Sequence, residues 1–477
     1  MRQAATARWI NIIVLVAAIA VYLFHPLKRF IWYDETVSVW CAKGITYDTK
    51  TQFGQATEIS SRQISQLNDH HHVLAATIAD NSNSYLYNMG LHYFTYLTGN
   101  HLNNYFMYSR LCGIAALIAL FLLCRQLWGN SWHTSAAVIL LMTDMVFWGM
   151  SNEIRTYAMG AFFVTLAGLY YFRYRDRHRS SDLLWFGLSC CGALICHYFA
   201  IYAIAIPVLA LLINERNKLL NKNNLYAILI PFGIIIAYVI VAYEGFLPKH
   251  MHTMILNNKD AQTFSIAEVG RLFMKHTAMN FKMVITRAKD SLAIVSIAFL
   301  FIILVYVYGI KSLKNNKKEK NTIHLLFTSG ISAGIFLMAL SIKNHTYAPF
   351  YYRYFIFSLP FCSVFVVAAC KSIAENANKA IGYSVLLLLT GSTVGMWLKE
   401  HNKLDSKGNY NHYLIAEKIV KDHVTRVSVP DWDDALLLNC FLPNDYLVTY
   451  ALHTDKQTFI LTHDNTTEEV PVLHNED

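Results

Sequence analysis

Residues 1–40 read MRQAATARWINIIVLVAAIAVYLFHPLKRFIWYDETVSVW. A strongly apolar run, residues 9–26, precedes two adjacent acids, Asp34 and Glu35. A membrane-spanning helix needs about 20 mostly apolar residues. No small-residue cleavage pattern follows the run, so we interpret it as a retained first span and not as a removed signal peptide. The pattern therefore places a pair of carboxylates at one surface of a membrane.

The composition of the whole chain supports this interpretation. Of the 477 residues, 55% are hydrophobic and only 15% are charged, whereas a soluble domain carries about 25% charged residues. The formal net charge of +9 would suggest a nucleic-acid ligand in a soluble protein. Here the basic residues gather in short connections between apolar runs, which indicates membrane orientation and not a nucleic-acid surface.

The apolar runs predict an α-helical polytopic membrane protein with about eleven spans. These fall at residues 9–26, 104–124, 134–150, 157–172, 183–197, 198–213, 225–243, 291–309, 322–342, 354–370 and 380–398. The run 183–213 is too long for one span and short for two, so we expect a tight turn near His197.

The basic connections predict the orientation. Residues 173–179, 214–222 and 311–320 are rich in Lys and Arg, and such short loops usually face the cytoplasm. The N-terminus is then cytoplasmic, and an odd number of spans puts the C-terminus outside. We expect an integral protein of the plasma (inner) membrane.

This topology divides the chain into a transmembrane domain, residues 1–398, and a small extracytoplasmic α/β domain, residues 399–477. The first outer loop, 27–103, contains amphipathic stretches that predict interfacial helices. Cys41 and Cys440 both lie in expected outer regions, where a disulfide between them could form.

Charged residues at the expected outer ends of the spans are the candidates for chemistry. Asp34 and Glu35 could form a catalytic acid pair at the membrane boundary, although a span can also simply end in charge. In SNEIRTYAMG, residues 151–160, Glu153 and Arg155 stand in a very short turn before Tyr157. They either mark a ligand path or close the turn as an ion pair.

A second arginine stands in YAPFYYRYFIFSLP, residues 347–360, where tyrosines surround Arg353. A guanidinium binds phosphate oxygens with two parallel hydrogen bonds, and the hydroxyl of Tyr352 could assist. The alternative is an arginine that extends along an aromatic belt toward water. His197 could contact a phosphate or a sugar hydroxyl, or it could be a satisfied buried histidine.

Weaker candidates occupy the outer loops. Asp80 and Asn83 open an amphipathic stretch in ADNSNSYLYN, where they could bind substrate or cap a helix. Lys249 could attract an anion in the loop 244–290. No metal-type spacing of Cys residues is present. The adjacent histidines of NDHHHV, residues 68–73, suggest a metal site, but neighbouring His residues cannot easily share one ion, so a solvated loop is the better interpretation.

Five stretches in this order resemble the GT-C superfamily of integral-membrane glycosyltransferases. More narrowly, they are similar to the branch of the protein O-mannosyltransferases and the aminoarabinose transferase of lipid A. The stretches are WYDETVSVW, DNSNSYLYNMGLHYFTYLTG, SNEIRTYAMGAFFVTLAGLYYF, HYFAIYAIAIPVLAL and YYRYFIFSLPF. The sequence departs from the branch where NSNSYLY replaces an HPPLYY-like stretch, and where Thr36, Val37 and Ser38 stand in place of an early arginine.

The resemblance implies a GT-C-like fold and a site on the outer face. Asp34 would be the catalytic base and Glu35 its partner. Arg155 and Arg353 would face the phosphate of a polyprenyl-phosphate sugar donor. The sugar and the acceptor, which could be a lipid, a glycan or a protein, stay open.

The sequence thus predicts transfer of a sugar from a polyprenyl phosphate to an acceptor hydroxyl, with inversion at the anomeric carbon. No cofactor is expected to be required, although Asp34 and Asp80 could hold Mg²⁺ or Mn²⁺. The rival functions are a transporter or flippase of lipid-linked saccharides, and an oligosaccharide ligase. A transporter should bury charged residues at mid-span, whereas the charges noticed here cluster at the outer ends.

Overall fold

The structure of the protein is a computed structural model. It describes residues 2–24, 31, 33–46, 56–80, 84–242, 264–283, 291–314, 316–400, 410–443, 446–453, 458–463 and 466–471.

Seven helical stretches in the described part of the chain are long and apolar enough to cross a membrane. Helix α1 contains the stretch Ala5–Phe24, α7 contains Leu102–Trp128, α14 contains Lys222–Ile240, α17 contains Leu292–Ser312 and α18 contains Lys317–Asn344. Segments η4 and α19 together contain Tyr352–Asn376, and α20 contains Lys379–Lys399. An eighth span results if α8 (Trp132–Met142) and α9 (Met145–Ser151), bent by 66°, count as one. The chain is therefore a polytopic α-helical membrane protein, as predicted.

The remaining three predicted spans coincide with helices that do not meet that length and composition. α10 (Tyr157–Arg177) carries a cluster of charges at its end. α11 (Ser180–Cys196) and α12 (Ile201–Asn214) are shorter, and the 3-10 turn η1 (Tyr198–Ala200) separates them. His197 stands at this break, with an extended backbone and a ring nitrogen that accepts the N–H of Phe199. The helix thus breaks where the sequence predicts a tight turn.

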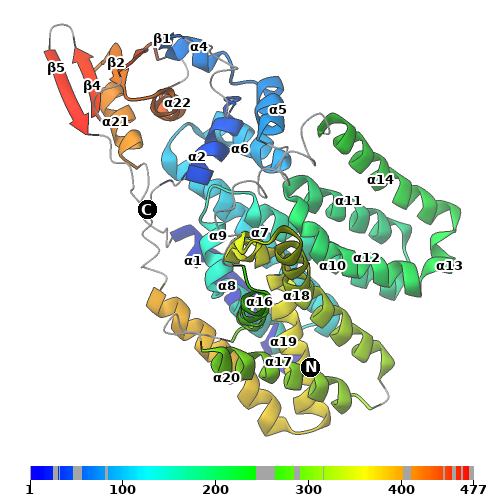
Figure 1. Ribbon diagram of the computed structural model, residues 1–477. Helices are drawn as coiled ribbons and strands as arrows, with labels where there is room; N and C mark the ends of the chain where they lie inside the picture. The colour runs from blue at the N-terminus through cyan, green and yellow to red at the C-terminus, as the bar shows by residue number, and fades with distance from the viewer. Residues whose placement is uncertain are drawn as a thin grey trace.

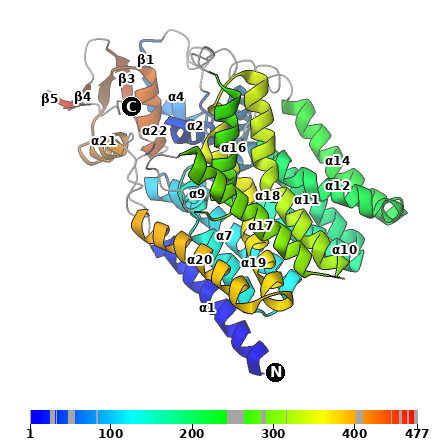
Figure 2. The ribbon, with the colours of Figure 1, turned by 60° about the horizontal axis from the view of Figure 1, so that its bottom comes forward.

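The bundle has two distinct ends. We call the end with residues 34, 151–156 and 345–353 the Asp34 end, and the end with the basic connections at 173–179, 214–222 and 311–320 the basic end. The N-terminus of α1 (Arg2–Phe24) lies at the far end of the molecule from the β-sheet (Figure 2). Helices α10 (Tyr157–Arg177) and α18 (Lys317–Asn344) each connect the two ends, since each begins at one of them and finishes at the other.

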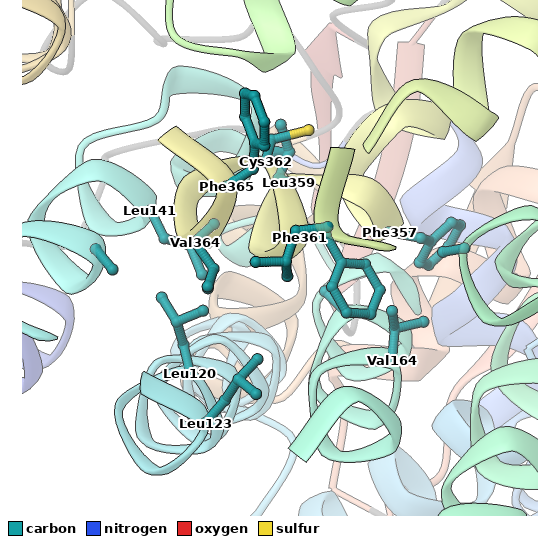
Figure 3. Packing of buried hydrophobic residues seen from close by; sticks show 14 of the residues in the cluster. Leu120, Leu123, Leu141, Val164, Phe357, Leu359, Phe361, Cys362, Val364 and Phe365 are labelled. Carbon is teal, nitrogen blue, oxygen red and sulfur yellow. The ribbon is translucent and has the colours of Figure 1, made fainter. Parts of the chain in front are cut away.

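Helix α19 (Leu359–Asn376) forms the centre of the bundle. Nearly all of its side chains are buried, because α8, α10, α17 (Leu292–Ser312), α18 (Lys317–Asn344) and α20 pack around it. Figure 3 shows this packing for Leu359, Phe361, Val364 and Phe365 of α19, Leu120 and Leu123 of α7, Leu141 of α8, and Val164 of α10. Such close packing holds the segment before α19 in place as well.

Two glycine positions permit close approaches next to this core. A Cβ on Gly160 of α10 would lie 2.5 Å from Phe357, which belongs to the 3-10 segment η4 (Tyr352–Ser358). A Cβ on Gly330 of α18 would lie 2.6 Å from Phe281, which follows α16 (Ile266–Asn280). Small residues let helices approach closely in membranes. Here they admit η4 and the end of α16 into the bundle.

The first loop folds into short helices at the Asp34 end. They are α2 (Tyr33–Ala42), α4 (Ser61–Ser65), α5 (His70–Ala79) and α6 (Tyr85–Thr98). Helix α6 matches the predicted amphipathic stretch, because Tyr87 and Leu91 are buried while Tyr96 and Leu97 are exposed. An apolar exposed face of this kind suits a membrane surface.

A five-stranded sheet combines the C-terminal segment with the first loop. Its order is β1-β3-β2-β4-β5, with β1 (Glu58–Ser60), β2 (Arg426–Val429), β3 (Thr449–Leu452), β4 (Thr458–His463) and β5 (Thr466–Pro471). Only β2 and β3 pair in parallel, and Ile59 of β1 stands opposite Tyr450 of β3. The sheet thus joins two segments that the sequence analysis assigned to different domains.

Helices α21 (Tyr410–Lys421) and α22 (Trp432–Phe441) accompany the sheet (Figure 1). One hydrophobic cluster contains Val39 and Trp40 of α2 together with Leu436 and Leu438 of α22. The helix that carries Asp34 therefore shares its core with the C-terminal segment. The remaining long helix of the bundle, α20 (Lys379–Glu400), ends at the Asp34 end.

Candidate active site

Asp34 and Glu35 lie in the first turn of α2, where the helix macrodipole favours carboxylates. Consecutive residues of a helix diverge by about 100° around its axis, so the two acids face different surroundings. The side chain of Asp34 is 28% exposed, whereas Glu35 is completely buried. The two carboxylates therefore have different environments.

Glu35 holds the turn that carries Arg155. Its Oε1 accepts the backbone N–H of Ile154 at 2.7 Å. The turn is buried, and Glu153 within it is only 5% exposed. A buried backbone N–H that lacks a partner is costly. Glu35 thus stabilises the position of this turn.

Two guanidinium groups meet at Asp34. Arg353 donates from Nη1 to Oδ2 of Asp34 at 2.5 Å, in an ion pair between residues 319 positions apart. Arg155 donates from Nη1 to the backbone carbonyl of Asp34 at 2.8 Å and to Oγ of Ser38 at 3.2 Å. The structure thus brings Asp34, Arg155 and Arg353 into one cluster.

Asp80 adds a third carboxylate near this cluster. It follows α5 and is half-buried. Burial raises the pKa of Asp80 to about 6, the positive charge of Arg155 opposes that rise, and the negative charge of Asp34 adds to it. A carboxyl group with this pKa can exchange a proton close to neutral pH.

Aromatic rings form one wall beside the arginines. The ring of Tyr157, at the start of α10, lies 5.9 Å from the guanidinium carbon of Arg155 and 5.5 Å from the ring of His197. The guanidinium carbon of Arg353 lies 5.4 Å from the ring of Tyr354. Such contacts stabilise a cation through the ring quadrupole.

His197 is buried among these rings and not at the surface of the cluster. Its Nδ1 accepts the N–H of Phe199 at 3.1 Å, so a neutral imidazole carries its proton on Nε2. Tyr352, next to Arg353, is 52% exposed. Of the predicted residues, His197 thus lies behind the cluster and Tyr352 at its edge.

Two predicted residues, Asn83 and Lys249, lie outside the described residues. Cys41 and Cys440 are described, and both are buried free thiols. No group of three or more His, Cys, Asp or Glu side chains that could hold a metal ion occurs among the residues whose structure is described. Asp34 and Asp80 are a pair of carboxylates whose charges interact across the site.

Sequence reasoning missed Ser38, which helps to orient Arg155. Its spacing contains the signal, because Ser38 lies one helical turn after Asp34 and so shares its face of α2. The reasoning also missed the role of the Ile154 backbone, which side-chain patterns cannot show.

Part of the chain matches a known protein family. Residues 84–243 match the family described as dolichyl-phosphate-mannose-protein mannosyltransferase. The match covers about a third of the chain, from α6 to α14 (Lys222–Ala242), and includes Arg155, Tyr157 and His197. No curated protein shows a significant match to the chain.

Proposed function

We propose that this chain acts on an acceptor hydroxyl at the extracytoplasmic face of the plasma (inner) membrane. The chain is a GT-C-type membrane glycosyltransferase that uses a lipid-phosphate sugar donor. Asp34 serves as the general base, and the sugar is transferred with inversion. The acceptor is a lipid, a glycan or a protein. One observation carries the proposal: a half-buried carboxylate and two guanidinium groups, from three distant segments, converge at one end of the bundle.

The two arginines are the phosphate-binding groups of this proposal. A guanidinium matches the geometry of phosphate oxygens, and it stays positively charged at any physiological pH. Arg155 is buried and Arg353 is 19% exposed at its side chain. Electrostatic stabilisation is stronger in such a partly dry site than in water. Arg155 and Arg353 therefore stabilise the negative charge that grows on the phosphate as the glycosidic bond breaks.

The ion pair between Asp34 and Arg353 represents the resting arrangement. When the donor phosphate binds, Arg353 exchanges the carboxylate of Asp34 for phosphate oxygens. The carboxylate is then available to accept a proton from the acceptor hydroxyl. The same movement of Arg353 binds the donor phosphate and releases the carboxylate of Asp34 to act as the base.

The transfer step has a simple balance. The acceptor oxygen forms a bond to the anomeric carbon, and its proton passes to Asp34. The bond between the anomeric carbon and the phosphate oxygen breaks, and polyprenyl phosphate leaves with the electron pair. Attack opposite the leaving phosphate inverts the configuration, as it does in inverting glycosidases, which place a carboxylate base on that face.

The proposed reaction does not require a divalent cation. Asp34 is engaged by Arg353, and the interaction between Asp34 and Asp80 is repulsive in the absence of a cation. If these two carboxylates do hold Mg²⁺ or Mn²⁺ beside the phosphate, activity is lost in EDTA and returns with the metal.

The decisive experiment uses the purified full chain in lipid nanodiscs with a panel of polyprenyl-phosphate sugars. Asp34→Asn should lower kcat by about 10² to 10⁴-fold, the usual contribution of a general base. Asp69→Asn is a matched control, because Asp69 is an exposed N-cap in the same loop and Asn preserves the cap. Transfer by Asp34→Asn at the wild-type rate would remove Asp34 from the proposed role. Retention of anomeric configuration in the product would exclude the single-displacement mechanism.

A further inference from the structure

A buried ion pair lies inside the helical bundle, away from the acid cluster. Lys282 Nζ lies 2.6 Å from Oδ2 of Asp144. The Lys282 side chain is completely buried and that of Asp144 is 9% exposed. The sequence predicts Asp144 inside the span 134–150 and Lys282 in the outer loop 244–290, so it does not predict this buried pair.

The pair lies near the middle of the bundle's length. Helix α8 has 11 residues and rises about 16 Å from the basic end, roughly half the 30 Å thickness of a bilayer core. Asp144 follows the end of α8, at the 66° bend between α8 and α9. Lys282 follows the end of α16, which enters from the opposite side, and has a left-handed backbone with φ of 72°. Both partners thus stand next to the end of a helix inside the bundle.

Charged residues at such a depth are costly and commonly functional. The pairing compensates for much of that cost, but two well-packed apolar residues could fill the same space. Stability alone therefore gives no reason for a charge pair here. A reason for the charge pair is better sought in the segments that these two helices support.

Asp144 connects directly to the segment of Arg155. Its Oδ1 accepts the N–H groups of Val146 and Phe147 at 3.0 and 3.1 Å, which caps helix α9. Helix α9 ends at Ser151, and the buried turn with Arg155 follows immediately. The direction of α9, and hence the position of that turn, depends on the geometry at Asp144.

Lys282 connects to the segment of Arg353 through α16. Both α16 and α9 contact η4, the 3-10 segment that includes Arg353. The ring of His276 in α16 stacks on Phe355 in η4, with centroids 5.0 Å apart and planes within 12°. Phe355 is only two residues from Arg353. The end of α16 therefore packs against η4 and supports it.

We infer that the Asp144–Lys282 ion pair is a positioning device that sets the distance between the guanidinium groups of Arg155 and Arg353. The pair joins the base of α9 to the end of α16, and these two helices support the two arginines. This inference rests on the proposed function, in which both arginines bind the donor phosphate. Asp144 and Lys282 are positioning residues, because neither contacts the cluster itself.

The test removes both charges while it preserves shape. Asp144→Asn keeps an N-cap oxygen for α9, and Lys282→Met keeps an unbranched apolar stem of similar length. The double variant Asp144→Asn/Lys282→Met leaves no buried charge without a partner. We expect it to fold with a Tm within a few degrees of wild type, yet to bind polyprenyl monophosphate at least tenfold more weakly. The donor KM should rise and kcat should fall, while the KM of the acceptor stays within twofold.

The control is Ser312→Ala/Ser372→Ala. It removes a buried hydrogen bond of 2.7 Å between α17 (Leu292–Ser312) and α19 at the basic end. It should leave the affinity for polyprenyl monophosphate unchanged. If this control weakens phosphate binding as much as the double variant does, the effect is a general consequence of a loosened bundle and the inference is wrong.

A second route avoids the charges altogether. His276→Leu removes the stacking on Phe355 and should weaken phosphate binding. The acceptor KM should again stay within twofold of the wild-type value. If the ion-pair double variant does not fold, this variant decides the inference on its own. Wild-type phosphate affinity in His276→Leu, or in a folded double variant, would overturn it.

Arg353→Lys serves as the reference for the proposed function. If Arg353→Lys weakens phosphate binding and the positioning variants do not, only the present inference fails. If Arg353→Lys itself binds polyprenyl monophosphate as wild type does, the proposed function fails first.

Discussion

Glu35 accepts the backbone N–H of Ile154 at 2.7 Å, and this hydrogen bond ties the first turn of α2 to the turn that carries Arg155. Asp34, one residue earlier, directs its carboxylate to Arg353 instead. Two adjacent acids thus have separate roles: one fixes the geometry of the site and the other lies in the cluster of charges.

This division predicts different outcomes for two substitutions of Glu35. Glu35→Gln keeps a carbonyl oxygen that can accept the Ile154 N–H, so transfer activity should stay within about fivefold of wild type. Glu35→Ala leaves that buried N–H without a partner, at a cost of about 1–3 kcal/mol, and should lower both Tm and kcat. Steady-state kinetics and thermal unfolding in nanodiscs measure both. An inactive but well-folded Glu35→Gln would show that the negative charge of Glu35 is itself required.

The arginines should not tolerate replacement by lysine. Arg353→Lys keeps the charge but loses the planar fork that binds phosphate with two hydrogen bonds. The donor KM should rise by about 10-fold or more, since a lost charge-assisted hydrogen bond is worth about 1.5–3 kcal/mol, and the acceptor KM should be little affected. Lys371→Arg, at the opposite end of the bundle in an exposed pair with Glu375, provides a comparison. Equal effects of both variants would argue against a phosphate site at Arg353.

The raised pKa of Asp80 predicts a pH-dependent contribution to stability. The folded state holds the Asp80 proton up to about pH 6, whereas an unfolded chain releases it near 3.9. The folded state therefore binds more protons within this window, so the contribution of Asp80 to stability decreases as pH rises through it. Asp80→Asn removes this dependence.

The difference in Tm between Asp80→Asn and wild type should accordingly be more positive at pH 7.5 than at pH 4.5. Differential scanning fluorimetry at both values measures it. Asp69→Asn is the control, because hydrogen bonding lowers the pKa of exposed Asp69. Both pH values lie above the ordinary Asp pKa, so the Tm difference for this control should stay nearly constant between them. A difference for Asp80→Asn that does not change with pH would mean that Asp80 titrates normally.

Gly160 should be sensitive to side-chain volume. A Cβ there would lie 2.5 Å from Phe357, and Gly160→Val should displace this ring and with it η4. Overpacking of this kind costs about 1–3 kcal/mol, and we expect the donor KM to rise as Arg353 moves. Gly149→Ala in α9 is the matched control, since a Cβ there meets nothing within 4 Å. Tm and donor KM should be close to wild type in that control. If Gly160→Val also has a Tm and a donor KM close to wild type, η4 accommodates the larger side chain without moving Arg353 and the prediction is wrong.

Hydropathy predicted much of this fold because the membrane leaves few choices. Each predicted apolar run coincides with a helix, and the break at His197 appears where a run was too long for one span. The backbone must satisfy its own hydrogen bonds in lipid, so an apolar run of sufficient length is already a helix. The placement of Asp34, Arg155 and Arg353 at one end follows from the alternation of spans.

Other features depend on contacts that no local pattern reveals. The bend at Asp144 occurs within one continuous apolar run, and Lys282 follows an amphipathic stretch that resembles a surface helix. Strand β1 has only three residues and forms because β3 offers an edge almost 400 positions later in the chain. The complete burial of Glu35 beside the half-buried Asp34 depends on the turn at Ile154. Tertiary contacts decide each of these cases.

The pairing of β1 with β3 also has a consequence for biogenesis. Residues 58–60 leave the ribosome long before their partner strand at 449–452 is synthesised. The core that α2 shares with the C-terminal segment is therefore completed only after residues 449–452 have been synthesised. A chain that ends before this strand contains Asp34 but lacks β3, so β1 has no pairing partner there and the core shared by α2 and the C-terminal segment stays incomplete.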